Sequence, residues 1–213
     1  MSESGSSYRW GKRILDVVVA SLLMILFLPA WLLVPIAIYV DSGRPIFFKH
    51  KRVGLDGEEF YLWKFRSMVP DADKILHQDN DDLLKKFKQG DWKMAADEDP
   101  RITHLGKFLR AFTIDEFPQL YNVLRGEMSM VGPRAYLREE LAEQTARYPE
   151  TKKYIKDIIS VKPGITGPWQ VSGRNEIPFA KRAKLDAEYA RSASIWQDIK
   201  ILCQTPRAML SKW

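Results

Sequence analysis

The longest apolar segment of the chain runs from Ile14 to Val40, and Asp16 is its only charged residue. As a single helix it would extend about 40 Å, enough to cross the roughly 30 Å hydrocarbon core of a bilayer. Pro29 lies near the middle of the segment, where a proline bends a helix and removes a backbone hydrogen bond. The part before it, Ile14–Leu28, would reach only about 22 Å and is too short to cross alone.

Basic residues flank the apolar segment on both sides: Arg9, Lys12 and Arg13 before it, and Arg44, Lys49, Lys51 and Arg52 after it. A crossing helix is expected to have more basic residues at its cytoplasmic end. Equal flanks favour a hairpin that enters the membrane and returns to the same side. We therefore predict a re-entrant helix-break-helix over residues 9–42, while length alone permits a simple transmembrane helix. Residues 1–8 are expected to be a disordered lead-in.

The remaining chain, residues 43–213, alternates short apolar pieces with charged, helix-forming stretches. This pattern predicts a mostly α domain with short β pieces, of the α+β class. Strands are expected at Ile46–Lys49 and Glu59–Phe65, joined by a turn over Val53–Glu58. Helices are expected within Pro70–Gln89, Ile102–Phe112, Tyr136–Arg147, Tyr154–Ser160, Pro178–Ala193 and Ile195–Met209.

The last of these helices is amphipathic and contains Pro206, so we expect it to break there. It suits a membrane surface, or packing on the domain, about equally well. Val161–Asn175 is rich in glycine and proline and is expected to be an irregular loop.

The charge balance restricts the function only weakly. The 33 basic and 27 acidic residues give a net charge of +6, which suits a phosphate ligand, a nucleic acid or an acidic membrane surface. A nucleic-acid binder would carry a basic stripe on one face, whereas the charges here are mixed throughout. The single cysteine, Cys203, excludes an internal disulfide. His50, His77 and His104 are too dispersed for the spacing of a zinc site.

The most suggestive chemistry lies at Asp115 and Glu116, two adjacent carboxylates. Thr113 and Glu116 have the spacing of a capping box, but a helix could instead start near Phe117 with Pro118 at its first position. Either arrangement places Asp115 at or just before a helix N-terminus, where anions are attracted. Asp115 could be a capping residue, or it could act in phosphate chemistry as a nucleophile or metal ligand. The pair alone does not decide.

Three basic side chains outside this pair are further candidates. Lys64 and Arg66 are two residues apart, so in an extended chain they point the same way and could hold a phosphate. A pair of solvated charges is the simpler interpretation. Arg174 lies in the glycine-rich loop, where the backbone can approach a ligand closely.

Several segments together resemble the bacterial sugar transferases, also called monotopic phosphoglycosyl transferases, from about Arg9 to Leu210. They occur in the family's order: KRILD with the proline-containing hairpin, R-x-G-x-x-G at Arg52–Gly57, KFRSM at Lys64–Met68, LRAFTIDEFPQL, GEMSMVGPR and KPGITGPWQVSGRN. One departure is Leu28-Pro29, where some members have Ser-Pro. The larger members also carry additional spanning helices before this unit, so the resemblance implies a minimal form.

The resemblance implies a reaction at the cytoplasmic face of the bacterial inner membrane, by a monotopic protein in contact with membrane lipid. A sugar 1-phosphate passes from a UDP-sugar to polyprenyl (undecaprenyl) phosphate, which starts the synthesis of a surface polysaccharide or glycoprotein glycan. Asp115 would attack the sugar-bearing phosphate and expel UMP, and the lipid phosphate would then attack the aspartyl intermediate. The oligomeric state stays open, a homodimer included.

The resemblance also implies roles for single residues. Asp115 would be the nucleophile and a contact of Mg²⁺, and Glu116 would orient the site, bind Mg²⁺ or manage a proton. Arg110, Lys64 and Arg134 would neutralise phosphate, with Arg66 and Arg174 as weaker candidates. Asp186 matches an acidic position of the family. The alternatives are a membrane-bound Mg²⁺-dependent nucleotide-sugar hydrolase or phosphatase, and a non-catalytic membrane-anchored scaffold.

Overall fold

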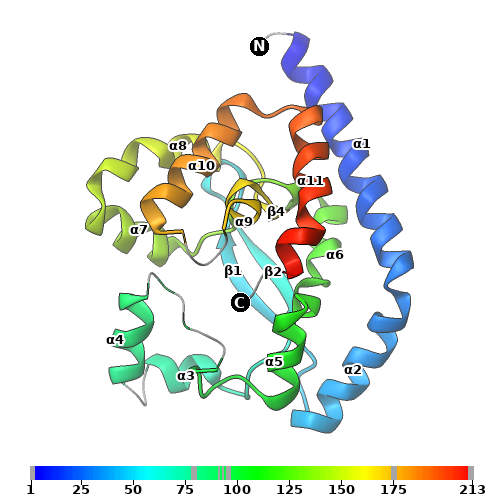
Figure 1. Ribbon diagram of the computed structural model, residues 1–213, viewed down its shortest axis with the longest axis vertical. Coiled ribbons are helices and arrows are strands. Elements are labelled where there is room, and N and C mark those ends of the chain that lie inside the picture. Colours follow the sequence, from blue (N-terminus) through cyan, green and yellow to red (C-terminus); the bar gives the residue numbers. More distant parts are fainter. Residues whose placement is uncertain are drawn as a thin grey trace.

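A computed structural model describes residues 3–77, 81–90, 92, 94, 97–173 and 177–210. Two helices, α1 (Glu3–Leu26) and α2 (Leu28–Ser42), form one flank of the molecule, and the smaller elements gather against them (Figure 1). The two meet at Phe27 with a bend of 62°. No single helix in the described ranges has the length and apolar character to cross a bilayer, whereas this bent pair taken together does by those two measures.

The bend lies where the sequence predicted it, because Pro29 occupies the first turn of α2, a position that needs no helical N–H. We refer to this bent pair of helices, α1 and α2, as the hairpin; its second helix ends at Ser42. However, α1 already begins at Glu3, so the helix includes most of the segment that we expected to be a disordered lead-in.

The rest of the chain is mostly helical with two small sheets. β1 (Phe47–Val53) pairs antiparallel with β2 (Glu59–Phe65), and β3 (Ser129–Val131) pairs parallel with β4 (Gly164–Thr166). The longer helices are α3 (Ala72–His77), α4 (Asp81–Gln89), α5 (His104–Ala111), α6 (Gln119–Arg125), α7 (Arg138–Arg147), α8 (Lys152–Ile159), α10 (Phe179–Ser192) and α11 (Ile195–Leu210). The α+β class and most of the predicted elements are thus confirmed.

Two predictions about the C-terminal part were wrong. The expected loop over 161–175 contains β4 and the short helix α9 (Pro168–Val171), because the backbone of Gly164 pairs with β3. A Cβ atom on Gly164 would lie only 2.1 Å from the backbone nitrogen of Gly132, so this pairing requires glycine. The second error concerns α11, which continues through Pro206 to Leu210 because it is held against α9 and the β3–β4 sheet.

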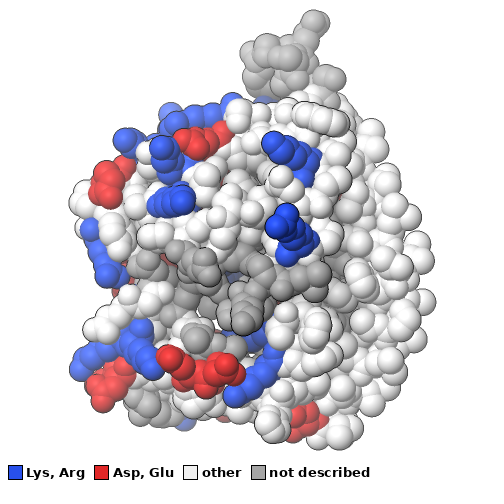
Figure 2. All heavy atoms as spheres, in the orientation of Figure 1, with Lys and Arg blue, Asp and Glu red and all other residues white. Residues whose placement is uncertain are grey.

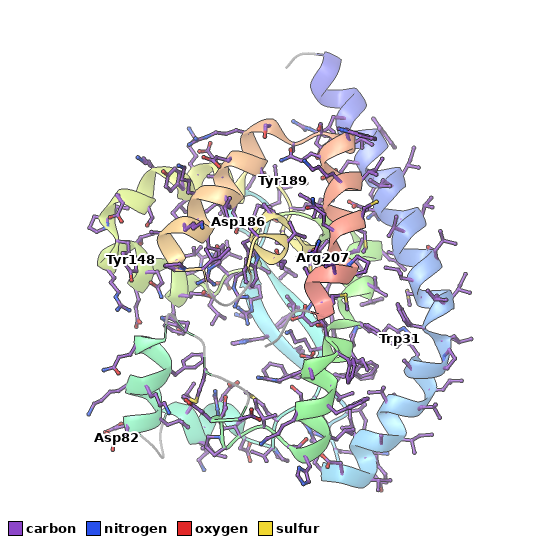
Figure 3. The ribbon with its side chains drawn as sticks, in the orientation of Figure 1. Trp31, Asp82, Tyr148, Asp186, Tyr189 and Arg207 are labelled. Atoms are coloured by element: carbon purple, nitrogen blue, oxygen red, sulfur yellow. The ribbon has the colours of Figure 1, made fainter. Side chains whose placement is uncertain are left out.

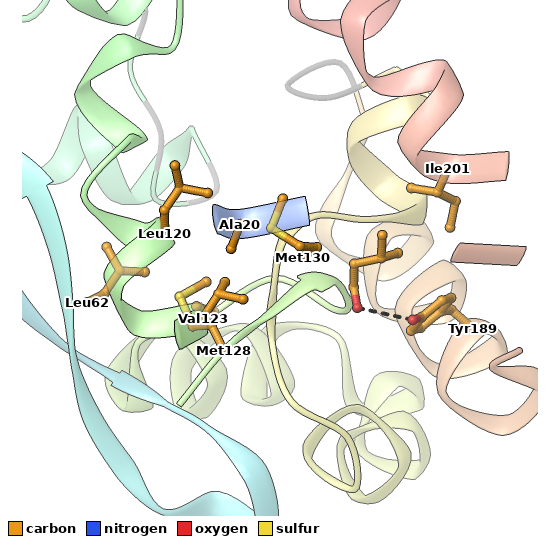
Figure 4. Packing of buried hydrophobic residues seen from close by; sticks show 10 residues of the cluster. Ala20, Leu62, Leu120, Val123, Met128, Met130, Tyr189 and Ile201 are labelled. Carbon is orange, nitrogen blue, oxygen red and sulfur yellow. Dashed lines mark hydrogen bonds between the residues drawn. The ribbon is translucent and has the colours of Figure 1, made fainter. Parts of the chain in front are cut away.

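The main core lies between the hairpin and the two sheets (Figure 4). Ala20 of α1 packs on Leu120 and Val123 of α6, and on Met130 of β3. The hydroxyl of Tyr189 donates a hydrogen bond of 3.1 Å to the carbonyl of Val131, which joins α10 to this layer. The inner face of the hairpin is therefore part of the core of the domain.

Charged residues near the start of α1 hold it against the domain. Arg13 donates hydrogen bonds of 2.6 Å to the carbonyls of Val123 and Leu124, at the C-terminal end of α6. Asp16 accepts bonds from the Ser129 hydroxyl and the Met130 N–H. Lys12 lies between Asp16 and the buried Asp198 of α11, with its Nζ at 3.4 and 3.0 Å from their carboxylate oxygens. The single charge in the apolar segment is thus a buried hydrogen-bond acceptor.

The far end of the hairpin is held as well. Nη2 of Arg66 donates to the carbonyls of Ser42 and Gly43 and to the Ser42 hydroxyl, at 2.7–2.8 Å. Both ends of the hairpin are therefore attached to the same domain. Its outer face is left apolar, with exposed side chains at Trp10, Ile14, Val18, Leu22, Ile25, Leu26, Leu28, Leu32, Leu33, Ile36, Tyr39 and Val40. The flank formed by α1 and α2 shows almost no charge in Figure 2.

Replacing Asp16 by alanine should destabilise the protein by about 3 kcal/mol, because it leaves the Met130 N–H buried without its acceptor and removes one of the two carboxylates that neutralise the buried Lys12 ammonium. Thermal unfolding of the detergent-solubilised protein measures the change. The matched control is Glu188→Ala, which removes an exposed carboxylate that pairs with Lys184 and should shift stability by less than about 1 kcal/mol. Equal melting temperatures for the two variants would refute the anchoring role.

Candidate active site

The two adjacent carboxylates lie in a tight connection between α5 and α6. α5 ends at Ala111, a 3₁₀ turn spans Ile114–Glu116, and α6 begins at Gln119 after Pro118. Asp115 therefore lies just before a helix N-terminus, as the sequence indicated. Of the two helix starts considered, the one near Phe117 and Pro118 is close to the observed start of α6. The capping box is not formed, because Thr113 takes a left-handed conformation with φ of 58° and its side chain makes no capping hydrogen bond. The backbone bends too sharply there for α-helix to begin.

Thr113 is a β-branched residue with positive φ directly beside the acidic pair. Such a conformation costs on the order of 1–3 kcal/mol and persists only where the surroundings impose it. Here the surroundings are close-packed, because Asp115 is only 4% exposed in the turn that follows. Strained backbone of this kind is concentrated at functional sites.

Lys64 at the end of β2 faces both carboxylates. Its Nζ lies 2.6 Å from Oε1 of Glu116 and 3.6 Å from Oδ2 of Asp115. Burial raises the pKa of Asp115 and the neighbouring Glu116 adds to this, while the charges of Lys64 and Arg110 act in the opposite direction. The net direction is upward, so Asp115 depends on nearby positive charge to stay ionised.

A hydrogen bond that the sequence did not predict orients Arg110 near Asp115 and Glu116. Its Nε donates to the Ser67 hydroxyl at 2.9 Å. The segment around Ser67 is in turn paired with residues 101–103: the Thr103 N–H donates to the Ser67 carbonyl, and the Val69 N–H to the Arg101 carbonyl. A Cβ on Gly106 of α5 would lie 1.9 Å from the Ser67 carbonyl oxygen, so only glycine permits this approach.

Two of the candidate residues, Arg134 and Asp186, lie together in a second cluster inside the domain. The Oδ2 atom of Asp186 on α10 accepts hydrogen bonds from the Arg134 N–H at 3.1 Å and from the Tyr136 hydroxyl at 3.0 Å (Figure 3 labels Asp186). Burial raises the pKa of Asp186 to about 7. The Arg134 guanidinium lies 3.7 Å from the buried carboxylate of Glu140 and 5.4 Å from the Trp169 ring.

Arg52 lies within the electrostatic reach of both groups of residues. Burial and the positive charge of Arg134 lower its pKa to about 10, while Glu140 and Glu116 both act to raise it. The charge of Arg52 is thus influenced by residues of both groups. The sequence analysis named Arg52 only as a flanking residue and as the start of a family motif, and it did not name Glu140, because these two residues come together from distant parts of the chain.

One further candidate, Arg66, makes its contacts outside these two groups of residues. The Arg66 guanidinium binds the end of α2, so it does not pair with Lys64 around a shared phosphate in this structure. Arg174 lies outside the described residues.

The family model for bacterial sugar transferases matches residues 7–212, nearly the whole chain. The chain belongs to the bacterial sugar transferase family. The matched residues include the bent pair of helices, the acidic turn between α5 and α6, and the backbone contact between β3 and β4.

Curated relatives of the family are similar over almost all of this chain. The undecaprenyl-phosphate galactose phosphotransferase of Salmonella typhimurium is 38% identical over 208 residues, covering 97% of this chain and 42% of its own length. The UDP-glucose:undecaprenyl-phosphate glucose-1-phosphate transferase of Escherichia coli is 37% identical, covering 91% of this chain and 39% of its own length. The exopolysaccharide production protein ExoY of Rhizobium meliloti is 35% identical, and the match covers 94% of this chain and 86% of that protein. The chain thus spans about two fifths of the first two relatives and most of the third.

Asp186 should make stability depend on pH. Its folded-state pKa of about 7 exceeds the unfolded value of about 4, so the unfolded state binds fewer protons between these pH values. The free energy of unfolding should therefore fall as pH rises from about 4 to 7, by at most about 4 kcal/mol from this group. Asp186→Asn removes the titration and should flatten this part of the profile.

Melting temperatures at pH 5 and pH 8 in detergent measure the effect. Asp81→Asn, an exposed change on α4, controls for the loss of a carboxylate. If native protein and Asp186→Asn lose the same stability between the two pH values, Asp186 is not held in a charge-excluding site.

Proposed function

We propose that this protein transfers a sugar 1-phosphate from a UDP-sugar to polyprenyl phosphate, with release of UMP. The main structural support is the buried Asp115, held in a strained turn between Lys64 and Arg110. A carboxylate in this position is suited to covalent catalysis on a phosphate, because the cations screen its charge from an anionic substrate. The names of the relatives, which include undecaprenyl-phosphate sugar-phosphate transferases, support the substrate classes.

In the first step an oxygen of Asp115 attacks the sugar-bearing phosphorus of the donor. The bond between that phosphorus and the bridging oxygen breaks, and the electron pair leaves with UMP. In the second step an oxygen of the lipid phosphate attacks the same phosphorus, and the bond to Asp115 breaks. The product is a lipid-linked diphosphosugar, and the carboxylate is regenerated. Two displacements replace one difficult one.

The neighbouring side chains have separable tasks in this scheme. Lys64 and Arg110 would neutralise the phosphate oxygens as charge builds up on them. Ser67 would hold the Arg110 guanidinium in the orientation seen here. Glu116, whose Oε1 already binds Lys64, would keep that ammonium beside Asp115.

The donor set fits Mg²⁺ only in a form shared with substrate. The described residues contain no group of three or more acidic, histidine or cysteine side chains able to hold a metal by themselves. Asp115 and Glu116 supply two carboxylates, which is the usual protein share for a magnesium ion that also binds phosphate oxygens. When bound, the ion would supply further neutralisation of the diphosphate.

We also propose that the hairpin is re-entrant and that the protein lies on the cytoplasmic face of the membrane. The support is that Arg13 near one end and Ser42 at the other are both bonded to the same domain, while the outer face between them is apolar. Phe117, next to the acidic pair, packs on Phe27 at the bend with ring centroids 4.5 Å apart. This contact would keep the acidic pair close to the segment that is proposed to enter the membrane.

Asp115→Asn should abolish transfer, with a loss of at least about a thousandfold, since the amide cannot form the covalent intermediate. Purified protein is incubated with Mg²⁺, undecaprenyl phosphate and a panel of UDP-sugars while UMP and lipid-linked product are measured. Without lipid, mass spectrometry of the native protein should find a sugar-phosphate adduct on the peptide that contains Asp115.

Asp81→Asn is the control and should retain full activity. A capping aspartate would tolerate the amide, so a fully active Asp115→Asn would show that Asp115 is not the nucleophile. A native protein that releases no UMP and forms no lipid-linked product would favour the scaffold. Free sugar phosphate in place of lipid-linked product would indicate a hydrolase.

The topology is tested by cysteine labelling in intact cells. In a Cys203→Ser background, single cysteines replace Arg9 or Lys49, which are exposed residues on either side of the hairpin. A re-entrant hairpin should leave both positions unreactive toward a membrane-impermeant maleimide until the cells are permeabilised. Labelling of only one of the two from outside would instead indicate a spanning helix.

A further inference from the structure

Arg182 of α10 is the largest fully buried side chain of the described structure, with no exposed surface. Within the described residues, none of its three guanidinium nitrogens has a hydrogen-bond partner. It lies instead 5.5–6.0 Å from the ring centres of Tyr136, Trp169 and Phe179. A buried charge without hydrogen bonds is costly, so its presence calls for a reason beyond packing.

The closest acidic group to Arg182 is Glu140, which is shared by three arginines. Oε1 of Glu140 lies 3.7 Å from Nη1 of Arg182 and 3.7 Å from Nε of Arg134, and Oε2 lies 3.9 Å from Nη1 of Arg52. A carboxylate facing one arginine normally forms a bidentate pair at about 2.7–2.9 Å. Here no arginine is that close to Glu140, which indicates that the three compete for it.

The three arginines differ in depth. The side chain of Arg182 is completely buried, that of Arg52 is 15% exposed and that of Arg134 is 25% exposed. Arg52 and Arg134 can therefore be reached by a ligand, whereas Arg182 cannot. Buried Nε atoms of both accessible arginines also lack a hydrogen-bond acceptor within the described part of the chain.

We propose that Arg182 is a positioning residue that draws Glu140 inward, so that the guanidinium groups of Arg134 and Arg52 remain available to an anionic ligand. The ligand class is a diphosphate or a nucleotide, and this identity rests on the proposed function. Without Arg182, Glu140 would close onto Arg134 and Arg52 and satisfy them as an internal ion pair. Asp186 fixes the other side of the arrangement, because it holds the Arg134 backbone N–H.

The test measures binding of UMP and of inorganic pyrophosphate to the full-length protein in nanodiscs by isothermal titration calorimetry. Arg182→Met should raise the dissociation constant for both ligands by about tenfold, the typical worth of one hydrogen bond to a charged group. The turnover number at saturating donor should change less than about threefold, because the acidic pair is untouched.

The decisive variant is the double change Arg182→Met with Glu140→Gln. Removing the charge of Glu140 should free Arg134 and Arg52 again and restore the dissociation constant to within about threefold of native. If Arg182 had a purely structural role, the added Glu140→Gln change would not restore the dissociation constant. Arg191→Met is the matched control on the same helix: it removes an exposed arginine paired with Asp157 and should leave binding unchanged.

Arg182→Lys serves as a second variant if the methionine protein does not fold, because it keeps a buried charge but loses the planar fork. It should weaken binding in the same direction and be rescued by the same Glu140→Gln change. Equal affinities in native and variant proteins, no pyrophosphate binding by either, or a double variant that stays weak would overturn the proposal. Failure of the proposed function is separate, since it would appear as absence of lipid-linked product from the native protein.

Discussion

The structure depends on a set of buried charges that join an otherwise apolar hairpin to the rest of the protein. Lys12, Arg13 and Asp16 are close together on α1, and their partners come from α6, β3 and α11. Each contact satisfies a backbone or carboxylate group that would be costly to bury alone. Because these bonds are directional, they fix the rotation of α1 about its axis. One face then packs in the core, and the opposite face is left as a continuous apolar surface.

Directional hydrogen bonds of the same kind also position the acidic turn. Arg66 holds the end of α2, and the next residue, Ser67, holds Arg110. One short segment after β2 therefore sets both the end of the hairpin and a cation beside Asp115. The position of α2 and the geometry of the carboxylates are linked through two consecutive residues.

The sequence predicted local features better than long-range ones. The apolar segment, the break near Pro29 and the β1–β2 pair follow from composition and period, which act over a few residues. The capping box suggested by Thr113 is not formed, because a capping pattern does not predict the sharp turn that tertiary packing imposes. Likewise the glycine-rich segment from Val161 forms a strand only because β3 is present to pair with it. Local patterns carry no information about such partners.

The candidate site shows the same difference between local features, which could be predicted, and long-range ones, which could not. Asp115, Glu116 and Lys64 could be named in advance, since they stand in motifs with a recognisable charge pattern. Glu140 and Arg182 could not, because a charged residue within an ordinary helix gives no sign that it will be buried. Their importance appears only when the fold brings α7 and α10 together around one carboxylate.

The inner face of the hairpin bears on how this protein can be handled. Ala20 and Ile38 are as buried as any interior residue, so the inner face of the apolar helices is an integral part of the domain. Removing α1 and α2 from the chain would therefore expose the core side chains that these helices cover. A water-soluble variant would need hydrophilic substitutions at the outward-facing positions of α1 and α2, while every inward-facing residue is kept.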